Sequence, residues 1–226
     1  MAEASRRVGD ITRPTWILAH EQTRGRGRRG RVWANPKGNL AATLIYRPNV
    51  PPAEAAKRSF VMANALYSAL ADFVPDYKLA VKWPNDVLLA GGKIAGILLE
   101  SSGQGGQVDW LSIGVGVNLS NTPENVHDSA FPPVALSSET DAPDAETFLT
   151  HLAATFAARE ARMVKHGFDG IRTEWLRHAA RKGEVITART TQEDIAGIFD
   201  DVDDDGNLIL ITARGTRVIP AADIFF

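Results

Sequence analysis

The spacing of apolar residues changes repeatedly along this chain between a strand-like and a helix-like pattern. Short β-branched or aliphatic runs bounded by Gly, Pro or Asn are typical of strands. Six such runs are Thr15–His20, Asn39–Arg47, Leu79–Trp83, Val87–Ala90, Ile94–Glu100 and Val108–Asn118. Helical spacing covers Ala53–Phe73, Ala145–Lys165 and Phe168–Ala180. Because these segments interleave without a regular βαβ repeat, they predict an α+β fold, a mixed β-sheet with helices packed on it.

Local signals mark boundaries within this pattern. Gly91-Gly92 separates two of the strand runs and favours a two-residue hairpin. Asp144 is placed to cap the helix that begins at residue 145, and Gly167 follows its end. The segment 120–144 is rich in Pro, Asn, Ser and Thr. We expect it to be a long loop, which in a compact domain is more often functional than idle.

The pattern changes after Gly183 to short alternating runs without a helix. These runs are Glu184–Thr190, Ile195–Val202, Leu208–Thr212 and Thr216–Ile219. They predict a small SH3-like β-barrel at residues 183–226, following a main domain at residues 1–182. A unit this small is weakly stable alone, so we expect it to dock on the main domain.

The residue types present exclude several kinds of chemistry. The chain has no cysteine, which removes disulfides, thiolate catalysis and thiolate metal sites. Its histidines show no zinc spacing, and neither a GxSxG elbow nor a P-loop lysine motif occurs, so metalloprotease, serine hydrolase and P-loop kinase activities are excluded. Residues 201–205 resemble the start of a calcium loop, but its twelfth position is Thr212, so a hairpin turn is predicted instead.

Composition and charge indicate a globular protein without a general affinity for nucleic acid. Apolar residues make up 44% and charged residues 23%, as in ordinary soluble domains, and no run approaches the roughly 20 apolar residues of a membrane span. The net charge of -2 argues against binding nucleic acid through the overall field. Residues 1–7 lack the apolar core of a secretory signal, so a cytoplasmic location is expected.

An arginine- and glycine-rich segment, residues 24–31, is the first candidate site. Its Gly25–Gly30 portion matches GxGxxG, but a dinucleotide fingerprint must open a helix, and Pro36 and Gly38 downstream oppose one. Glycines allow close backbone approach, and guanidinium groups bind phosphate or carboxylate in bidentate fashion. The segment therefore predicts an anion-binding loop; an exposed basic loop without a specific task is the alternative.

Two further patterns could serve a site. Asn85 and Asp86 carry oxygens suited to Mg²⁺ or an incoming amine, and Lys93 follows the Gly-Gly turn, although a plain turn with an exposed lysine is the commoner structure for such spacing. Gly114 and Gly116 alternate in an apolar strand and leave one face without side chains. Such a face predicts close approach of a flat group.

Four blocks of the sequence together resemble the signature blocks of biotin protein ligases, in their order and spacing. They are residues 21–31 (EQTRGRGRRGR), 82–86 (KWPND), 93–98 (KIAGIL) and 114–118 (GVGVN). The resemblance spans nearly the whole chain and implies a class II synthetase or biotin ligase-like catalytic domain, in a short form without an N-terminal DNA-binding domain. It also implies a two-step reaction, in which biotin and ATP form biotinyl-5'-adenylate and a specific lysine of a biotin carboxyl carrier protein or domain then takes the biotin.

The resemblance also implies roles for individual residues. Arg28 and Lys93 would neutralise charge in catalysis, and Asp86 would orient or deprotonate the acceptor amine. The positions that match biotin contacts are Gln22, Arg26, Gly27, Arg28, Lys93, Gly96 and Gly116. Those on the ATP side are Arg28, Arg31, Trp33, Asn85 and Asn118. The loop after Asn118 would fold over the adenylate, and Mg²⁺ would assist, with its protein ligands unassigned.

The sequence departs from the family's pattern at its start. Family members begin this domain with a strand and a Ser-Thr-Asn-type biotin contact, whereas Met1–Ala4 resembles the residues that follow that contact. We therefore expect one wall of the biotin pocket to be missing and binding to be weaker. Without a helix-turn-helix region, neither DNA nor a membrane is an expected partner. A homodimer is compatible with the family, and the particular carrier protein is not specified by the sequence.

Two other functions compete with this hypothesis. A lipoate or octanoate ligase or transferase of related fold would also use a lysine and a glycine-rich strand, but its arginine segment normally looks different. A noncatalytic RNA-binding module would need flanking aromatics and a basic domain. Trp33 is the only aromatic residue near the arginine segment, and the net charge is negative.

Overall fold

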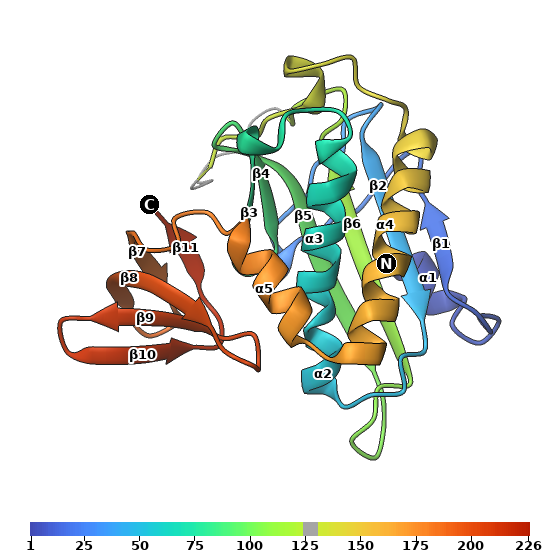
Figure 1. Cartoon of the computed structure of the whole chain (residues 1–226). Helices are drawn as coiled ribbons and strands as arrows, with labels where there is room; N and C mark the ends of the chain where they lie inside the picture. Colours follow the sequence, from blue (N-terminus) through green and yellow to red (C-terminus); the bar gives the residue numbers. More distant parts are fainter. Residues whose placement is uncertain (124–130) are drawn as a thin grey trace.

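A computed structural model describes residues 1–123 and 131–226 (Figure 1). Its larger part is a six-stranded sheet with the strand order β1-β2-β6-β5-β4-β3. The strands are β1 Thr15–Leu18, β2 Leu40–Tyr46, β3 Leu79–Lys82, β4 Asp86–Leu89, β5 Gly92–Ser102 and β6 Trp110–Val117. The α+β class is confirmed, but all ladders between these strands are antiparallel, where a mixed sheet was expected. Strands β3 to β6 follow one another through short connections, which favour antiparallel pairing.

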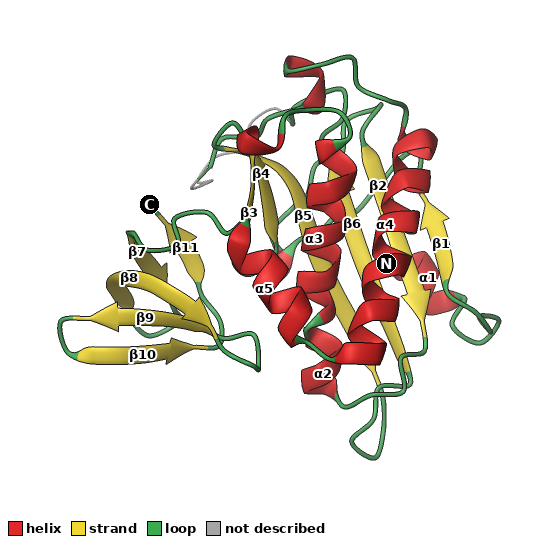
Figure 2. Ribbon diagram, viewed as in Figure 1, coloured by secondary structure: helices red, strands yellow, loops and turns green. Residues whose placement is uncertain are grey.

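Helices cover one face of this sheet (Figure 2). They are α3 Arg58–Ala71, α4 Ala145–His166 and α5 Asp169–Arg177, preceded by the short α2 Pro52–Ala56. The helix α3 is buried nearly all round because it packs against the sheet and against both α4 and α5. The helix expected at Ala53–Phe73 is interrupted at Lys57, where the Phe60 N–H bonds to the Lys57 carbonyl in a tighter turn.

The opposite face of the sheet is only partly covered. The short helix α1, Ala2–Arg6, places Ala4 in a small apolar cluster with Ile11 and Ile45. Side chains alternate between the two faces of a strand. Since Ile113 and Val115 of β6 belong to the core under the helices, the glycines between and after them face the other side.

The C-terminal part is a five-stranded antiparallel sheet with the order β10-β9-β8-β7-β11. Its strands are β7 Val185–Arg189, β8 Asp194–Val202, β9 Leu208–Thr212, β10 Gly215–Ile219 and β11 Asp223–Phe225. The sheet stays open, because β11 pairs with β7 and no ladder joins β11 to β10 among the described residues. The small C-terminal β-unit that was expected is present, but as an open sheet and not as a closed barrel. The expected turn between β8 and β9 is present, with Gly206 in the left-handed region.

The C-terminal sheet packs against the main part through α5, which lies between them (Figure 1). The Trp175 ring of α5 lies 6.4 Å from that of Phe199 in β8, centroid to centroid. Arg172 of α5 donates to the Val202 carbonyl at 2.8 Å, and Trp83 Nε1 donates to the Gly206 carbonyl at 3.0 Å. The apolar residues of the two parts form one continuous core. Within residues 1–123 and 131–226, no helix is long and apolar enough to cross a membrane.

Candidate functional site

A cavity of about 1150 Å³ lies on the glycine-bearing side of the main sheet and extends to the C-terminal sheet. It is lined by β5, β6, the arginine segment, the turn before β4, and residues of β7 and β11. All the site residues expected from the sequence line this one cavity: Gln22, Arg26, Gly27, Arg28, Arg31, Trp33, Asn85, Asp86, Lys93, Gly96, Gly116 and Asn118. Four separate blocks of sequence thus meet in one place.

The glycine face of the strands forms the floor of the cavity, and the Trp33 indole lies on it. A Cβ added to Gly116 would come within 2.4 Å of Trp33 Cε2, and one added to Gly96 within 3.1 Å of Cζ3. Over Gly114, the equivalent position is covered by the Met1 side chain. The flat group expected against this face is therefore, in this structure, the chain's own indole. Its Nε1 is buried and has no hydrogen-bond partner among the described residues.

The arginine segment is a folded loop and not a loose basic stretch. The Gly27 N–H donates to the Arg31 carbonyl at 2.7 Å, and the Trp33 N–H donates to the Gly25 carbonyl at 3.0 Å. A short 3-10 turn, Arg28–Gly30, closes the loop, with Arg29 in the left-handed region at φ 57. These backbone hydrogen bonds give the loop a defined conformation.

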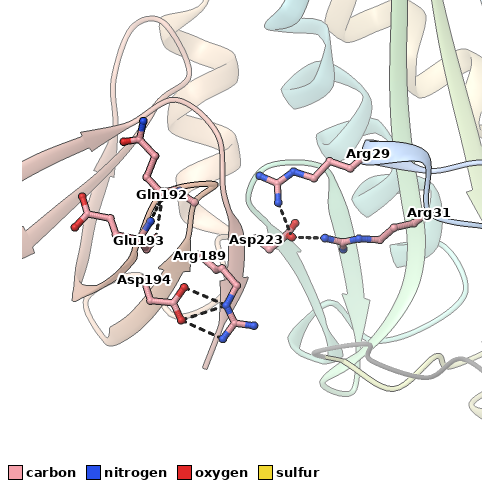
Figure 3. A network of polar contacts seen from close by, with 8 residues as sticks. Arg29, Arg31, Arg189, Gln192, Glu193, Asp194 and Asp223 are labelled. Carbon is pink, nitrogen blue, oxygen red and sulfur yellow. Dashed lines mark hydrogen bonds and ion pairs between the residues drawn. The ribbon is translucent and has the colours of Figure 1, made fainter.

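Acidic residues from distant parts of the chain hold three of these arginines. Arg26 pairs with Glu100 of β5 at 2.6 Å. Arg29 pairs with Asp223 of β11 at 2.9 Å, and Arg31 contacts the same carboxylate (Figure 3). The loop is thereby fixed between the main sheet and the C-terminal sheet.

Arg28 differs from its arginine neighbours because its guanidinium makes no ion pair or hydrogen bond within the described part of the chain. Burial lowers the pKa of Arg28, and nearby Asp223 and Asp86 partly offset that effect. A half-buried guanidinium without a counter-ion binds an incoming anion without first giving up a partner. Arg28 is therefore the cation most available to a substrate.

Asp86 lies between two lysines in the wall of the cavity. Its Oδ1 is 2.7 Å from Lys93 Nζ, and its Oδ2 is 3.1 Å from Lys82 Nζ. Burial alone would raise the pKa of Asp86, but the charges of Lys93 and Lys82 outweigh burial and hold it below its ordinary value. Asp86 is thus an ionised carboxylate. The alternative of a plain turn with an exposed lysine is wrong, because Lys93 is 28% exposed and bound to this carboxylate.

The two asparagines expected near the nucleotide line the cavity but already have partners. Asn85 Nδ2 donates to the Ile97 carbonyl at 2.6 Å. Asn118 is buried and donates to the Val134 carbonyl at 3.1 Å, which ties β6 to the segment that returns toward α4. Their amides therefore shape the wall. Gln22 differs from both asparagines, since its Oε1 is buried and has no hydrogen-bond partner within residues 1–123 and 131–226.

Sequence analysis missed several residues of this cavity. Lys82 belongs to the KWPND block, but its position in the sequence alone indicates no role for it. Arg189, Asp223 and Phe225 come from the C-terminal sheet, and no local pattern could have placed them beside residues 24–31. Among the described residues, cations in the lining outnumber carboxylates: Arg26, Arg28, Arg31, Lys82, Lys93 and Arg189 against Asp86 and Asp223. The cavity is therefore suited to a ligand with several negative charges.

No cluster of three or more His, Asp or Glu side chains suited to a metal ion occurs in residues 1–123 or 131–226. Asp86, the carboxylate that sequence analysis considered for Mg²⁺, has an ammonium group on each oxygen. Two adjacent positive charges disfavour a divalent cation at this position. The protein alone does not fit a magnesium site here.

Comparison with known proteins matches both parts of the chain. Residues 2–118 match the Biotin/lipoate A/B protein ligase family, and residues 183–226 match the Biotin protein ligase C terminal domain. The biotin–[acetyl-CoA-carboxylase] ligase of Paracoccus denitrificans is 50% identical over 229 residues, covering 100% of this chain and 95% of that protein. The bifunctional ligase/repressor BirA of Bacillus subtilis is 32% identical over 214 residues, covering 93% of this chain and 65% of that protein.

Solved structures give the same result for the fold. The structure of biotin protein ligase from Aquifex aeolicus in complex with biotin and ATP superposes with a TM-score of 0.80. The match has 22% sequence identity and covers 98% of this chain and 92% of the other. At that level of identity the match supports the shared fold alone. The sequence matches establish the family.

Proposed function

Because this chain belongs to the biotin protein ligase family, we propose that it activates biotin with ATP and transfers it to a lysine of a carrier protein. The observation that carries the proposal is the meeting of four sequence blocks in one electropositive cavity. Biotin and ATP supply a carboxylate and a triphosphate, and a cavity rich in cations suits both. In this proposal residues 1–182 are the catalytic domain and residues 183–226 are a C-terminal domain that completes the cavity wall.

The first step joins two anions. The biotin carboxylate oxygen attacks the α-phosphorus of ATP, the bond to the β-phosphate oxygen breaks, and pyrophosphate leaves. Arg28 binds the approaching charges because it has no counter-ion to release. Lys93 Nζ lies 2.7 Å from Asp86 Oδ1. In this step it leaves that carboxylate and pairs with the substrate anion. Cations fixed in place before the reaction stabilise the transition state more than mobile solvent can.

The floor of the cavity shapes the substrate site. The glycine face leaves room for a flat ring system close to the strands. Trp33 and Gln22 each have a buried polar atom that no described residue bonds, and these atoms would meet polar groups of the ligand. We propose that the biotin ring system lies near Gly116 and that the Trp33 indole turns toward the nucleotide side.

The second step transfers biotin to the carrier. The acceptor amine attacks the acyl carbon of the mixed anhydride, the bond to the phosphate oxygen breaks, and AMP leaves. Asp86 Oδ1, released by Lys93, receives the proton that the acceptor ammonium must lose. Exclusion of water protects the anhydride while this occurs. The loop after Asn118 that was expected to shield the adenylate includes residues 124–130, which lie outside the described residues.

Mg²⁺ enters this proposal with the nucleotide. Since the described residues offer no carboxylate cluster for it, we place the ion on the phosphates of ATP, where it would neutralise part of their charge. A carrier domain of a biotin-dependent carboxylase is the proposed acceptor, in keeping with the name of the Paracoccus relative. A cytoplasmic location, where ATP is available, belongs to the same proposal. A homodimer stays a prediction.

The decisive experiment is ATP-dependent labelling of a biotin carboxyl carrier domain. Biotin, lipoate and octanoate would be supplied separately and in competition, and a carrier that lacks its acceptor lysine would serve as the control. Labelling by biotin alone is the expected result. Preferential labelling by lipoate or octanoate would overturn the proposal in favour of the related acyl ligases.

A further inference from the structure

Lys82 is a buried lysine in the cavity wall for which the proposed reaction has no role so far. It ends β3 and lies directly opposite Asp86 across the β3–β4 pair. Its side chain is 8% exposed, and its Nζ lies 4.9 Å from the centre of the Phe131 ring. Burial lowers the pKa of Lys82, so its charged form exists at a cost.

A purely structural role accounts poorly for this lysine. Buried ion pairs are expensive to form, and apolar residues of similar volume often stabilise a fold equally well. A stabilising residue at the end of β3 would not need a charge. A charge inside the cavity, 3.1 Å from the proposed proton acceptor, affects the chemistry of that acceptor.

The two oxygens of Asp86 are divided between the two lysines. Oδ2 accepts a hydrogen bond from Lys82, whereas Oδ1 forms an ion pair with Lys93 but no hydrogen bond of normal angle. When Lys93 turns to the substrate anion, Oδ1 becomes available and Lys82 keeps its hold on Oδ2. The carboxylate then cannot rotate freely, because one of its oxygens is tethered.

We propose that Lys82 is a positioning residue for the transfer step, which holds Asp86 by Oδ2 so that Oδ1 faces the acceptor amine. The inference rests on the proposed function, in which Asp86 receives the proton of that amine. Lys82 also keeps the carboxylate ionised after Lys93 has left it. An ionised Asp86 attracts the acceptor ammonium and is ready to take its proton.

Other charged groups face this pair from the surrounding elements. Lys93 reaches Asp86 from β5, and Arg28 acts on it from the arginine segment. Asp223 of β11 acts on Lys82 and favours its charged form. Once Arg28 and Lys93 bind substrate anions, Lys82 is the cation that remains on Asp86. Removal of Lys82 therefore raises the pKa of Asp86 most strongly in the loaded enzyme.

The test compares Lys82→Met, Lys82→Arg and a control, Lys78→Met, which removes a partly exposed lysine paired with Glu139 outside the cavity. Biotinyl-adenylate is formed first, and its single-turnover transfer to the carrier domain is measured as a function of pH. Transfer to hydroxylamine is measured in parallel, because hydroxylamine is neutral at neutral pH and needs no proton acceptor. Adenylate formation is followed separately by pyrophosphate exchange.

In Lys82→Met, we expect the loss of transfer rate at low pH to begin about one pH unit higher, since an opposite charge at this distance shifts a carboxyl group by about that much or more. Transfer to hydroxylamine and adenylate formation should change little. Lys82→Arg should restore most of the pH profile, and Lys78→Met should match the parent. A structural role alone would lower stability without moving this profile.

An unmoved profile in folded Lys82→Met, or an equal loss in both steps, would overturn the inference. If Lys82→Met does not fold, Lys82→Gln keeps a hydrogen-bond donor to Oδ2 without the charge and gives the same measurement. Failure of both variants to fold would assign Lys82 to stability and also overturn the inference. Failure of the parent enzyme to form biotinyl-adenylate would instead refute the proposed function.

Discussion

The Asp223 carboxylate in β11 lies 2.9 Å from the Arg29 guanidinium, so the C-terminal sheet holds the arginine segment of the main domain (Figure 3). Arg31 contacts the same carboxylate. Ion pairs between partly exposed groups contribute little to stability. Their effect here is on position, because the same loop carries Arg28 into the cavity.

Asp223→Asn should weaken ATP-dependent adenylation while the fold is preserved. The variant keeps a polar side chain but loses the charge that holds two arginines, so the loop is expected to sample more positions. A loss of about 0.5–1 kcal/mol, or roughly twofold to fivefold in catalytic efficiency for ATP, fits partly exposed pairs. Pyrophosphate exchange at several ATP concentrations measures it. Glu193→Gln, which removes the Glu193–Arg217 pair of the same sheet, is the matched control. Equal effects in the two variants would refute the positional role of Asp223.

Gly116→Ala should displace the Trp33 indole and weaken biotin binding. The added Cβ would lie 2.4 Å from the indole, a rigid group that must move as a whole. Overpacking of this kind costs about 1–3 kcal/mol. Calorimetric titration with biotin and tryptophan fluorescence report the two effects. Gly114→Ala is the control on the same strand, because its new Cβ meets the flexible end of Met1. A stronger effect from Gly114→Ala would contradict the glycine-face argument.

Arg28→Ala should reduce adenylate formation by about a hundredfold, the usual loss when one fixed electrostatic partner of a transition state is removed. The protein should stay folded, since Arg28 has no partner in the described part of the chain. Arg24→Ala, an exposed arginine of the same segment, provides the comparison. Pyrophosphate exchange measures the first step and circular dichroism checks the fold. A comparable loss in Arg24→Ala would show that the segment acts through its overall charge.

Arg58→Ala should destabilise the main domain without altering biotin affinity. Arg58 pairs with Glu160 at 3.0 Å, with the two side chains 4% and 16% exposed, on the helix side of the sheet. Loss of one partner leaves a buried charge uncompensated, at about 3–5 kcal/mol. Urea unfolding measures this loss. The double variant Arg58→Met with Glu160→Leu should recover most of it. No recovery would mean that the pair contributes more than charge compensation.

Local patterns in the sequence predicted the elements that depend on local physics. The helix expected from Ala145 spans Ala145–His166, and Asp144 caps it by accepting a hydrogen bond from the Thr147 N–H at 2.7 Å. Both signals, the helical spacing of apolar residues and the capping side chain, depend only on residues that are close in the sequence. The β4–β5 hairpin was also expected, but its two turn residues are Ala90 and Gly91, one position before the expected Gly91-Gly92, because Gly92 already pairs with Leu89.

Long-range features could not be predicted in this way. Strand β11 has three residues, too few for an alternating pattern, and it gains its place by pairing with β7. The open C-terminal sheet follows from that pairing. In the candidate site, the resemblance selected residues that line one cavity, but the role of Lys82 depends on a carboxylate whose other oxygen faces Lys93. The spacing of residues along the sequence does not reveal that the two oxygens of one carboxylate contact different lysines.

The ion pair between Arg29 and Asp223 joins residues that are 194 positions apart in the chain. During synthesis on the ribosome, N-terminal parts of a protein generally fold first. A nascent chain can therefore complete the six-stranded sheet while its arginine loop still lacks this counter-charge. Binding of ligand anions by the arginine loop should therefore begin only after residue 223 has been added. The six-stranded sheet of the growing polypeptide would be folded before the chain can bind its substrates.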